Sequence, residues 1–239
     1  MSNVGDGIEA GNARWSFSGE SVDRFDEHVA RSIPFYREGH GIVCDLSDFF
    51  IGDDSLCVEL GCSTGSLSMA LAERHRDRSG ARFIGIDIET QMIDLAEQRK
   101  AAAGGDNLSF VRDDILQAEL QGVDMIVAYY TVQFVRPSQR QLLFNRLYEA
   151  LNWGGALLLF EKVRANDARF QDITTNLYQE YKLKQGYSPE EIVGKSRSLK
   201  GVLEPFSTQG NLDLMQRAGF VDVLSVFKYV CFEGFLAIK

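Results

Sequence analysis

The sequence predicts an α/β fold with a largely parallel sheet, and three observations support this prediction. From Leu56 onward, short apolar segments alternate with longer amphipathic ones, as a parallel sheet with crossover helices requires. The first apolar segment runs directly into a turn that contains Gly61 and Gly65. An acidic residue, Asp87, ends the second apolar segment. Because ligands bind at the carboxyl ends of the strands in open α/β sheets, the turn and the acid are expected to share one binding edge.

Five strands are expected first, and each is a short apolar segment bounded by polar or turn-forming residues. They are predicted at residues 56–60, 83–86, 108–112, 123–127 and 156–160. The helices between them follow from apolar residues at helical spacing, such as Met92, Ile93 and Ala96. These helices are predicted at residues 65–75, 90–102 and 138–151. The Asn-Trp-Gly-Gly sequence at 152–155 is interpreted as the turn into the fifth strand.

The end of the chain predicts a helix at 212–218 and then two strands, at 221–229 and 232–238. Two other segments, about 25–51 and 165–204, fall outside the alternation and are expected to cover the binding edge as helical caps. In the second of these, aromatic residues at helical spacing suggest core packing or a dimer interface more than ligand contact. The polar, glycine-rich residues 1–14 are predicted to be a disordered leader, and residues 15–239 a single domain.

Composition limits the classes of function. The 239 residues are 45% hydrophobic, which suffices for a full core, and no apolar run approaches the roughly 20 residues needed to span a bilayer. The N-terminus lacks the basic-then-apolar order of a signal peptide. A net charge of −9 opposes direct contact with a polyphosphate backbone. The four cysteines show no metal-ligand spacing, so we expect a cytoplasmic protein with reduced thiols, no metal site, no membrane segment and no direct nucleic-acid binding.

The turn after the first strand suits a nucleoside that carries an amino acid. Gly61 and Gly65 lack a Cβ where the backbone bends and a ligand approaches. Asp87 can accept hydrogen bonds from both hydroxyls of a ribose. The glycines are spaced G-x-x-x-G, so the dinucleotide fingerprint G-x-G-x-x-G is absent, as is a Lys-Ser/Thr pair for phosphates. Glu59 would repel a pyrophosphate but attract an ammonium group.

The sequence Glu59-Leu60-Gly61-Cys62-Ser63-Thr64-Gly65 resembles motif I of the class I S-adenosylmethionine (SAM)-dependent methyltransferases. From about Trp15 to the C-terminus, the chain also resembles the carboxy-SAM synthases, with similar motifs at 25–36, 131–134, 151–156, 161–162 and 186–188. This resemblance implies a Rossmann-like seven-stranded methyltransferase sheet, a homodimer, and SAM as the cofactor. By similarity, the cofactor-binding positions are Tyr36, Gly61, Cys62, Ser63, Asp87, Ile88, Asp114 and Ile115. Glu59 and Gly65 from motif I, and Tyr129, are candidates for the same site.

Two positions depart from the family pattern. The family has an asparagine where this chain has Tyr129, and an arginine that reaches from the partner subunit to the extra carboxylate of carboxy-SAM where this chain has Ser196. A charged hydrogen bond of that kind contributes roughly 1.5–3 kcal/mol, and the neighbouring Arg197 is the open alternative for it. The favoured interpretation is SAM-dependent methyl transfer to a small-molecule acceptor. The alternatives are a carboxy-SAM synthase acting on SAM and prephenate, and a non-catalytic SAM-binding partner protein.

Candidates for contact with the acceptor come from the fourth strand and from the first cap segment. Tyr129, Tyr130 and Gln133 follow the fourth strand at the carboxyl edge of the sheet. His28 lies on the predicted cap helix and is a candidate general base, needed only if the acceptor holds its proton at neutral pH. His75 lies in a basic helix end and is predicted to be exposed to solvent.

Overall fold

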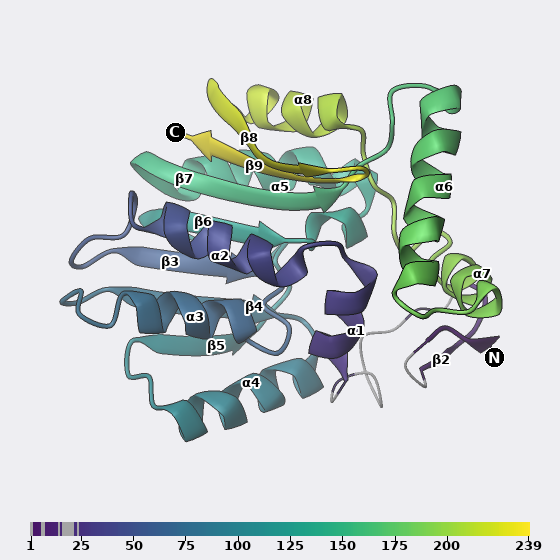
Figure 1. Ribbon diagram of the computed structural model, residues 1–239. Helices are drawn as coiled ribbons and strands as arrows, with labels where there is room; N and C mark the ends of the chain where they lie inside the picture. Colours follow the sequence, from purple (N-terminus) through teal and green to yellow (C-terminus); the bar gives the residue numbers. More distant parts are fainter. Residues whose placement is uncertain (1, 6–7, 14, 16–21, 23) are drawn as a thin grey trace.

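The computed structural model describes residues 2–5, 8–13, 15, 22 and 24–239 of the chain. Its centre is a seven-stranded sheet with the strand order β5-β4-β3-β6-β7-β9-β8 (Figure 1). The first five of these strands run parallel, and β9 is antiparallel to both β7 and β8. The strands are β3 (Leu56–Leu60), β4 (Arg82–Asp87), β5 (Leu108–Arg112), β6 (Val123–Tyr129), β7 (Leu151–Lys162), β8 (Asp222–Tyr229) and β9 (Phe232–Ile238). This arrangement confirms the predicted Rossmann-like seven-stranded sheet.

Helices cover both faces of the sheet. The helices α5 (Pro137–Ala150) and α8 (Thr208–Ala218) contact each other and close one apolar core, in which Phe144 and Met215 are fully buried. On the opposite face, α2 (Tyr36–Ser47), α3 (Ser66–Arg74) and α4 (Thr90–Ala103) close a second core. Each predicted helix lies within a few residues of its observed position, because the apolar spacing that predicted it is the spacing that packs on the sheet.

The fifth parallel strand is longer than predicted. Residues 152–155 were expected to form a turn, but β7 runs without a break from Leu151 to Lys162. This part of the strand pairs irregularly with β6, with a register shift between Val123 and Met125. On its other side, Gly154 and Gly155 exchange backbone hydrogen bonds with Lys239 at the end of the chain. Residues 152–155 have no register partner in β6, and Gly154 has a φ angle of +80°, so they form an irregular part of the strand that the hydrogen bonds to Lys239 hold in place.

The predicted cap segments are helical and lie beyond the carboxyl ends of the strands. The helix α1 (Phe25–Ser32) precedes α2, and the second segment forms α6 (Ala168–Lys184) and α7 (Pro189–Ser198). Figure 1 shows α1, α6 and α7 gathered on the side to which the parallel strands point. Local sequence sets two of the helix starts, because Asp167 caps α6 and Ser188 forms a capping box with Glu191 on α7.

The prediction of a disordered leader is wrong for residues 2–5 and 8–13. The short strands β1 (Ser2–Asn3) and β2 (Glu9–Ala10) pair with each other and contact α7. Val4, Ile8 and Ala10 are buried together in this hairpin, which a composition dominated by polar residues and glycine conceals. Residues 1, 6, 7 and 14 of the predicted leader lie outside the described part of the chain.

The prediction that His75 is exposed is also wrong, since only 2% of the residue is accessible. Its Nε2 atom lies 2.7 Å from Ser47 Oγ on α2, and its ring stacks on Phe83. Burial lowers the pKa of His75, which favours the neutral imidazole in this position. In the part of the chain that the structure describes, no helix has the length and hydropathy needed to cross a membrane.

Candidate active site

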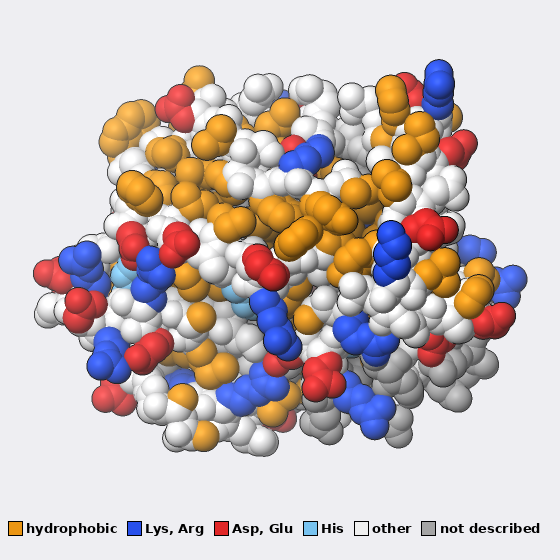
Figure 2. Space-filling model, in the orientation of Figure 1, with side chains coloured by type: hydrophobic (Ala, Val, Ile, Leu, Met, Phe, Trp, Pro, Cys, Tyr) orange, Lys and Arg blue, Asp and Glu red, His pale blue; other side chains and the backbone are white. Residues whose placement is uncertain are grey.

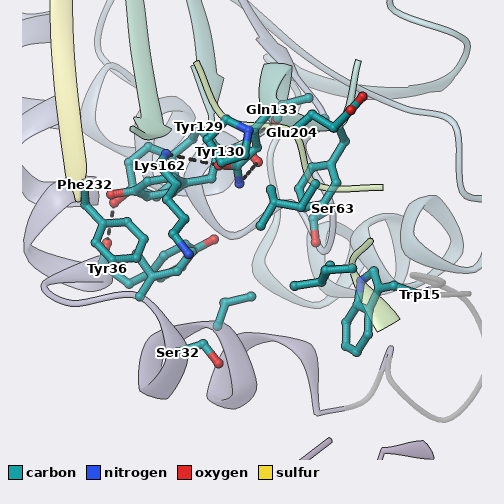
Figure 3. Close-up of a pocket in the computed structure, with 18 of the residues that line it drawn as sticks. Trp15, Ser32, Tyr36, Ser63, Tyr129, Tyr130, Gln133, Lys162, Glu204 and Phe232 are labelled. Atoms are coloured by element: carbon teal, nitrogen blue, oxygen red, sulfur yellow. Dashed lines mark hydrogen bonds between the residues drawn. The ribbon is translucent and has the colours of Figure 1, made fainter. Parts of the chain in front are cut away.

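A cavity of about 900 Å³ lies at the carboxyl ends of the parallel strands, between the sheet and the cap helices. Its size is at the upper end of the range of roughly 300–1,000 Å³ usual for small-molecule sites. The structure brings nearly all of the predicted site residues to its walls: His28, Tyr36, Glu59, Gly61, Cys62, Ser63, Asp87, Ile88, Asp114, Ile115, Tyr129, Tyr130 and Gln133. Gly65 is the exception: it lies on the side of the turn that packs against Phe110 and Ala96 and is not part of the cavity wall. Figure 3 shows part of this wall.

The turn between β3 and α3 has a backbone that only particular residues tolerate. Gly61 and Gly65 have φ angles of +70° and +76°, in the left-handed region that favours glycine. A Cβ on Gly61 would lie 2.5 Å from the side chain of Thr131, and one on Gly65 would overlap the ring of Phe110. The glycines therefore let the turn pack closely on Thr131, which follows β6, and on Phe110 of β5.

Asp87 joins this turn to the end of β4. Its Oδ2 atom accepts a hydrogen bond from the Ser63 N–H at 2.8 Å, and its Oδ1 atom accepts one from the Glu89 N–H at 2.9 Å. Burial raises the pKa of Asp87, and these backbone donors oppose that effect by favouring the carboxylate. Each oxygen retains a lone pair, so the carboxylate can still accept from the hydroxyls of a ligand.

Glu59 is a buried acid on the same wall. Its Oε2 atom accepts a close hydrogen bond from Ser68 Oγ on α3. Burial is the main cause that raises the pKa of Glu59 to about 8, so much of the population holds a proton at neutral pH. A cation bound beside Glu59 would favour the ionised form.

A polar network that the sequence did not reveal ties α1 to the turn. Asp26 accepts hydrogen bonds from Thr64 Oγ1 at 2.7 Å and from Ser66 Oγ at 3.2 Å. It also pairs with the Arg99 guanidinium of α4 at 2.7 Å. Asp26 lies inside the family-like segment 25–36, but nothing in the local pattern indicates these partners. The network holds α1 against the start of α3, and Asp26, Thr64 and Ser66 all line the cavity there.

Tyr129 has a structural hydrogen bond. Its hydroxyl donates to the backbone carbonyl of Tyr36 at 2.6 Å, where α2 begins. Gly39 makes room for this hydroxyl, because a Cβ at that position would overlap it. Tyr129 therefore fixes the first cap segment on the sheet, and its hydroxyl proton is used within the protein.

Gln133 is also held by backbone groups. Its Nε2 atom donates to the carbonyl of Tyr130 at 3.1 Å, and its Oε1 atom accepts from the Lys162 N–H at 3.0 Å. Tyr130 adopts a φ angle of +60°, which is unusual for a residue with a large side chain. Gln133 thus ties the ends of β6 and β7 together around a strained residue, an arrangement frequent at functional sites.

His28 is buried in a cluster between α1 and α7. Its Nε2 atom lies 3.0 Å from Lys195 Nζ, and its ring stacks on Trp15 with centroids 5.8 Å apart. Of the two residues considered for the family arginine, Ser196 lies on the cavity wall, whereas Arg197 is not part of the described wall of the single chain.

Lys162, Tyr178 and Phe232 are cavity residues that sequence reasoning did not assign. Lys162 ends β7, and its Nζ atom lies 4.4 Å from the centroid of the Tyr178 ring on α6. Phe232 begins β9 and packs edge to face with Tyr178 at 5.2 Å. Burial lowers the pKa of Lys162. In the sequence, only the family-like pair Glu161–Lys162 indicated that Lys162 could be a site residue. The proximity of the Tyr178 and Phe232 rings is visible only in the fold.

The fold and the site define a SAM-dependent enzyme of the class I methyltransferase type. A family model with the description "Methyltransferase domain" matches residues 57–155 of the chain. A putative SAM-dependent methyltransferase from Methanococcus maripaludis superposes with a TM-score of 0.61 at 18% identity, covering 96% of each chain, which shows the shared fold.

More specifically, the chain belongs to the carboxy-S-adenosyl-L-methionine synthase family. It is 34% identical over 226 residues to the protein of that name from Campylobacter lari, covering 95% of both chains. It is 35% identical to the protein of that name from Nautilia profundicola, with the same coverage. The resemblance inferred from the motifs is thereby confirmed.

Proposed function

We propose that this protein transfers the methyl group of SAM to a small-molecule acceptor. The observation that carries this proposal is the continuity of the cavity. One space of about 900 Å³ joins the glycine turn and Asp87 to an aromatic chamber under α2 and α6. Such a space has room for a nucleoside cofactor and a second small molecule, and the cap helices cover part of it.

In this proposal the turn holds the cofactor. Asp87 accepts from the ribose hydroxyls, and Glu59 pairs with the ammonium group of the methionine moiety. Cys62, Ser63, Ile88, Asp114 and Ile115 line the remaining nucleoside site, and Tyr36 closes it from α2. The cofactor supplies an activated methyl group on a good leaving group. The protein therefore contributes mainly by positioning the acceptor, by excluding water and by holding both partners in line.

The departures at Tyr129 and Ser196 support methyl transfer over carboxy-SAM chemistry. The Tyr129 hydroxyl is engaged with the Tyr36 carbonyl. Ser196 on the cavity wall offers a hydroxyl where the family has a guanidinium, and a neutral hydroxyl cannot form the bidentate charged contact. A carboxylated cofactor would lose a charged partner here, whereas SAM would not.

A second candidate is a carboxy-SAM synthase, favoured by 34–35% identity to proteins of that name over 95% of the chain. A non-catalytic SAM-binding partner is the third. Mass spectrometry of the cofactor that co-purifies, and of the products after incubation with SAM and prephenate, distinguishes them. We expect SAM or S-adenosylhomocysteine and no carboxylated cofactor. A carboxylated cofactor in either sample would establish the synthase instead, and the control is the same incubation without protein.

We also propose that the protein is a homodimer through α6. Phe170, Ile173 and Leu177 are 56%, 46% and 52% exposed in the single chain, and so large an apolar stripe is unusual for a solvated helix. Figure 2 shows further apolar side chains gathered in a band across the same side of the molecule. Burial of such a stripe would give an apolar interface typical of stable dimers.

The expected result is a particle of about twice the 26.8 kDa chain mass in light scattering at micromolar concentration. Leu177→Glu should shift the mass towards that of one chain, because it places a charge in the apolar interface. Val221→Glu is the matched control, since Val221 is apolar and 88% exposed but lies immediately before β8 rather than on α6. A monomeric wild type would rule out this interface.

The cysteines bear on the proposed location. Cys44, Cys57, Cys62 and Cys231 are all free thiols. Unpaired cysteines are typical of reducing compartments, which supports the cytoplasmic location proposed from the sequence.

A further inference from the structure

Three tyrosine rings, called the tyrosine cluster below, meet in the cavity beside the glycine turn. They belong to Tyr36 at the start of α2, to Tyr129 at the end of β6 and to Tyr130, which follows it, and all three line the cavity (Figure 3). The Tyr36 and Tyr130 rings are nearly parallel, with centroids 6.2 Å apart and an interplanar angle of 24°. The Tyr129 ring is steeply inclined to both, at 67° and 73°, with centroids 5.1 Å and 4.8 Å away. A ligand group placed against the cluster can therefore contact more than one ring.

The sheet places the tyrosine cluster next to the residues proposed to hold the cofactor. Leu60 of β3 pairs with Ala128 of β6, so Tyr129 lies level with Gly61 at the start of the glycine turn. Asp87 ends β4, on the other side of β3. The glycine turn thus lies between the acid proposed for the ribose and the three rings.

The surroundings of the tyrosine cluster favour a positive charge. Burial is the main cause that raises the pKa of each of its phenols, so all three stay neutral, and nearby acids raise the pKa values further. These acids are Glu59 and Asp26 around Tyr36, Glu38 and Glu59 around Tyr129, and Glu161 near Tyr130. In the described part of the chain, no Lys or Arg side chain lies over a ring of the cluster, and the Lys162 ammonium group faces Tyr178 instead.

Of the two cationic groups of SAM, the ammonium group is already assigned to Glu59, which leaves the sulfonium. A sulfonium has three carbon substituents and no N–H or O–H to donate, so hydrogen bonds cannot satisfy its charge in a buried site. Faces of aromatic rings can, as they do for quaternary ammonium ions. Tyr129 adds such a ring at a position where the family pattern has an asparagine.

We propose that the rings of Tyr36, Tyr129 and Tyr130 recognise the sulfonium charge of SAM, so that the site prefers the methyl donor to the neutral product S-adenosylhomocysteine. This inference rests on the proposed function, because that reaction consumes SAM. Methyl transfer forms a bond from the acceptor to the methyl carbon and breaks the bond from that carbon to sulfur. The electron pair of the broken bond stays on sulfur, which becomes a neutral thioether. The tyrosine cluster then no longer faces a cation, which favours release of the product.

Titration calorimetry of the full-length protein with SAM and with S-adenosylhomocysteine, at one pH, measures this preference as a ratio of dissociation constants. The wild type should bind SAM about 5- to 30-fold more tightly, because a cation–π contact in a desolvated site stabilises only the charged ligand. Tyr36→Leu removes one ring but keeps the backbone carbonyl that accepts from Tyr129. It should lower the preference for SAM at least about threefold, whereas Tyr36→Phe, which retains the ring, should restore it.

Tyr130→Leu is a second, independent variant and should lower the preference in the same way. Sinefungin, which carries an ammonium group in place of the sulfonium, distinguishes recognition of the charge from contact with the methyl group. Its affinity should fall in both leucine variants as that of SAM does. Tyr148→Leu is the matched control, since Tyr148 packs edge to face on Phe220 and lies outside the cavity wall. Its ratio should equal that of the wild type.

Three results would overturn the inference: equal affinities of the wild type for SAM and S-adenosylhomocysteine, an unchanged ratio in both leucine variants, or a loss of affinity for SAM without one for sinefungin. Binding of S-adenosylhomocysteine to each variant reports that the variant is folded. A wild type that binds neither SAM nor S-adenosylhomocysteine would contradict the proposed function, whereas a wild type that binds both equally contradicts only this inference.

Discussion

Replacing Asp87 with alanine is expected to weaken binding of S-adenosylhomocysteine by roughly 1–3 kcal/mol, about 5- to 150-fold in the dissociation constant. The physical reason is twofold. The ribose hydroxyls of the ligand would lose their acceptor in a buried site, and the Ser63 and Glu89 N–H groups would lose theirs. The second loss loosens the turn itself, so the effect should be near the upper end of the range. Isothermal titration calorimetry measures it directly.

Two variants separate these contributions. Asp53→Ala is the matched control, because Asp53 also accepts a backbone hydrogen bond, from the Ser79 N–H at 3.0 Å, but lies outside the cavity wall. Its affinity should stay within experimental error of the wild type. Asp87→Asn keeps an acceptor for one backbone donor, so its loss of affinity should be intermediate. An unchanged affinity in Asp87→Ala would remove Asp87 from the cofactor site.

The second large effect is a pH dependence of cofactor binding that comes from Glu59. In the ligand-free protein, burial raises the pKa of Glu59 to about 8, so the acid is largely protonated at pH 7. A bound ammonium group favours the carboxylate and lowers this pKa in the complex. Binding therefore releases a proton between the two pKa values, and the affinity falls as the pH is lowered from 8 to 6, by at most about tenfold per pH unit.

Titration calorimetry of S-adenosylhomocysteine at pH 6, 7 and 8, in buffers of different ionisation enthalpy, measures both the affinity and the released proton. Asp87 is a second buried acid on the same wall, and burial also raises its pKa. Glu59→Gln separates the two residues, because the amide cannot ionise but retains an acceptor for the Ser68 hydroxyl. This variant should bind more weakly at pH 8 and lose most of the dependence on pH. A wild type whose affinity is the same at pH 6 and pH 8 would show that Glu59 does not contact the ammonium group.

The elements that could be predicted from the sequence are those whose signal is local. The strand at Phe232–Ile238 and the strand at Leu108–Arg112 have the predicted bounds, since apolar patterning and flanking turns are properties of neighbouring residues. The β7 strand is longer than predicted because Leu151 pairs with β6 and because Gly154 and Gly155 bond to Lys239 at the end of the chain, and neither partner is visible locally. The same limit explains the N-terminal hairpin, which is stabilised by contact with α7.

The cofactor half of the site could be predicted for a related reason. Glu59, Gly61 and Ser63 lie on one short turn, and Asp87 follows the neighbouring strand. The topology of a parallel sheet places the carboxyl ends of adjacent strands at one edge, so their proximity follows from the order of the elements. A family-like motif at the same residues strengthened that inference.

The sequence by itself therefore determined the strand and helix order, the glycine turn with its acid, and the family. Only the tertiary structure decided how the polar groups are used. It pairs Asp26 with Arg99, 73 positions away, directs the Tyr129 hydroxyl to the Tyr36 carbonyl, and places the Lys162 ammonium group against the Tyr178 ring of α6. The physical reason is that periodicity specifies which face of an element is buried, whereas hydrogen bonds and charge contacts depend on which distant residues the closed fold brings within a few ångströms.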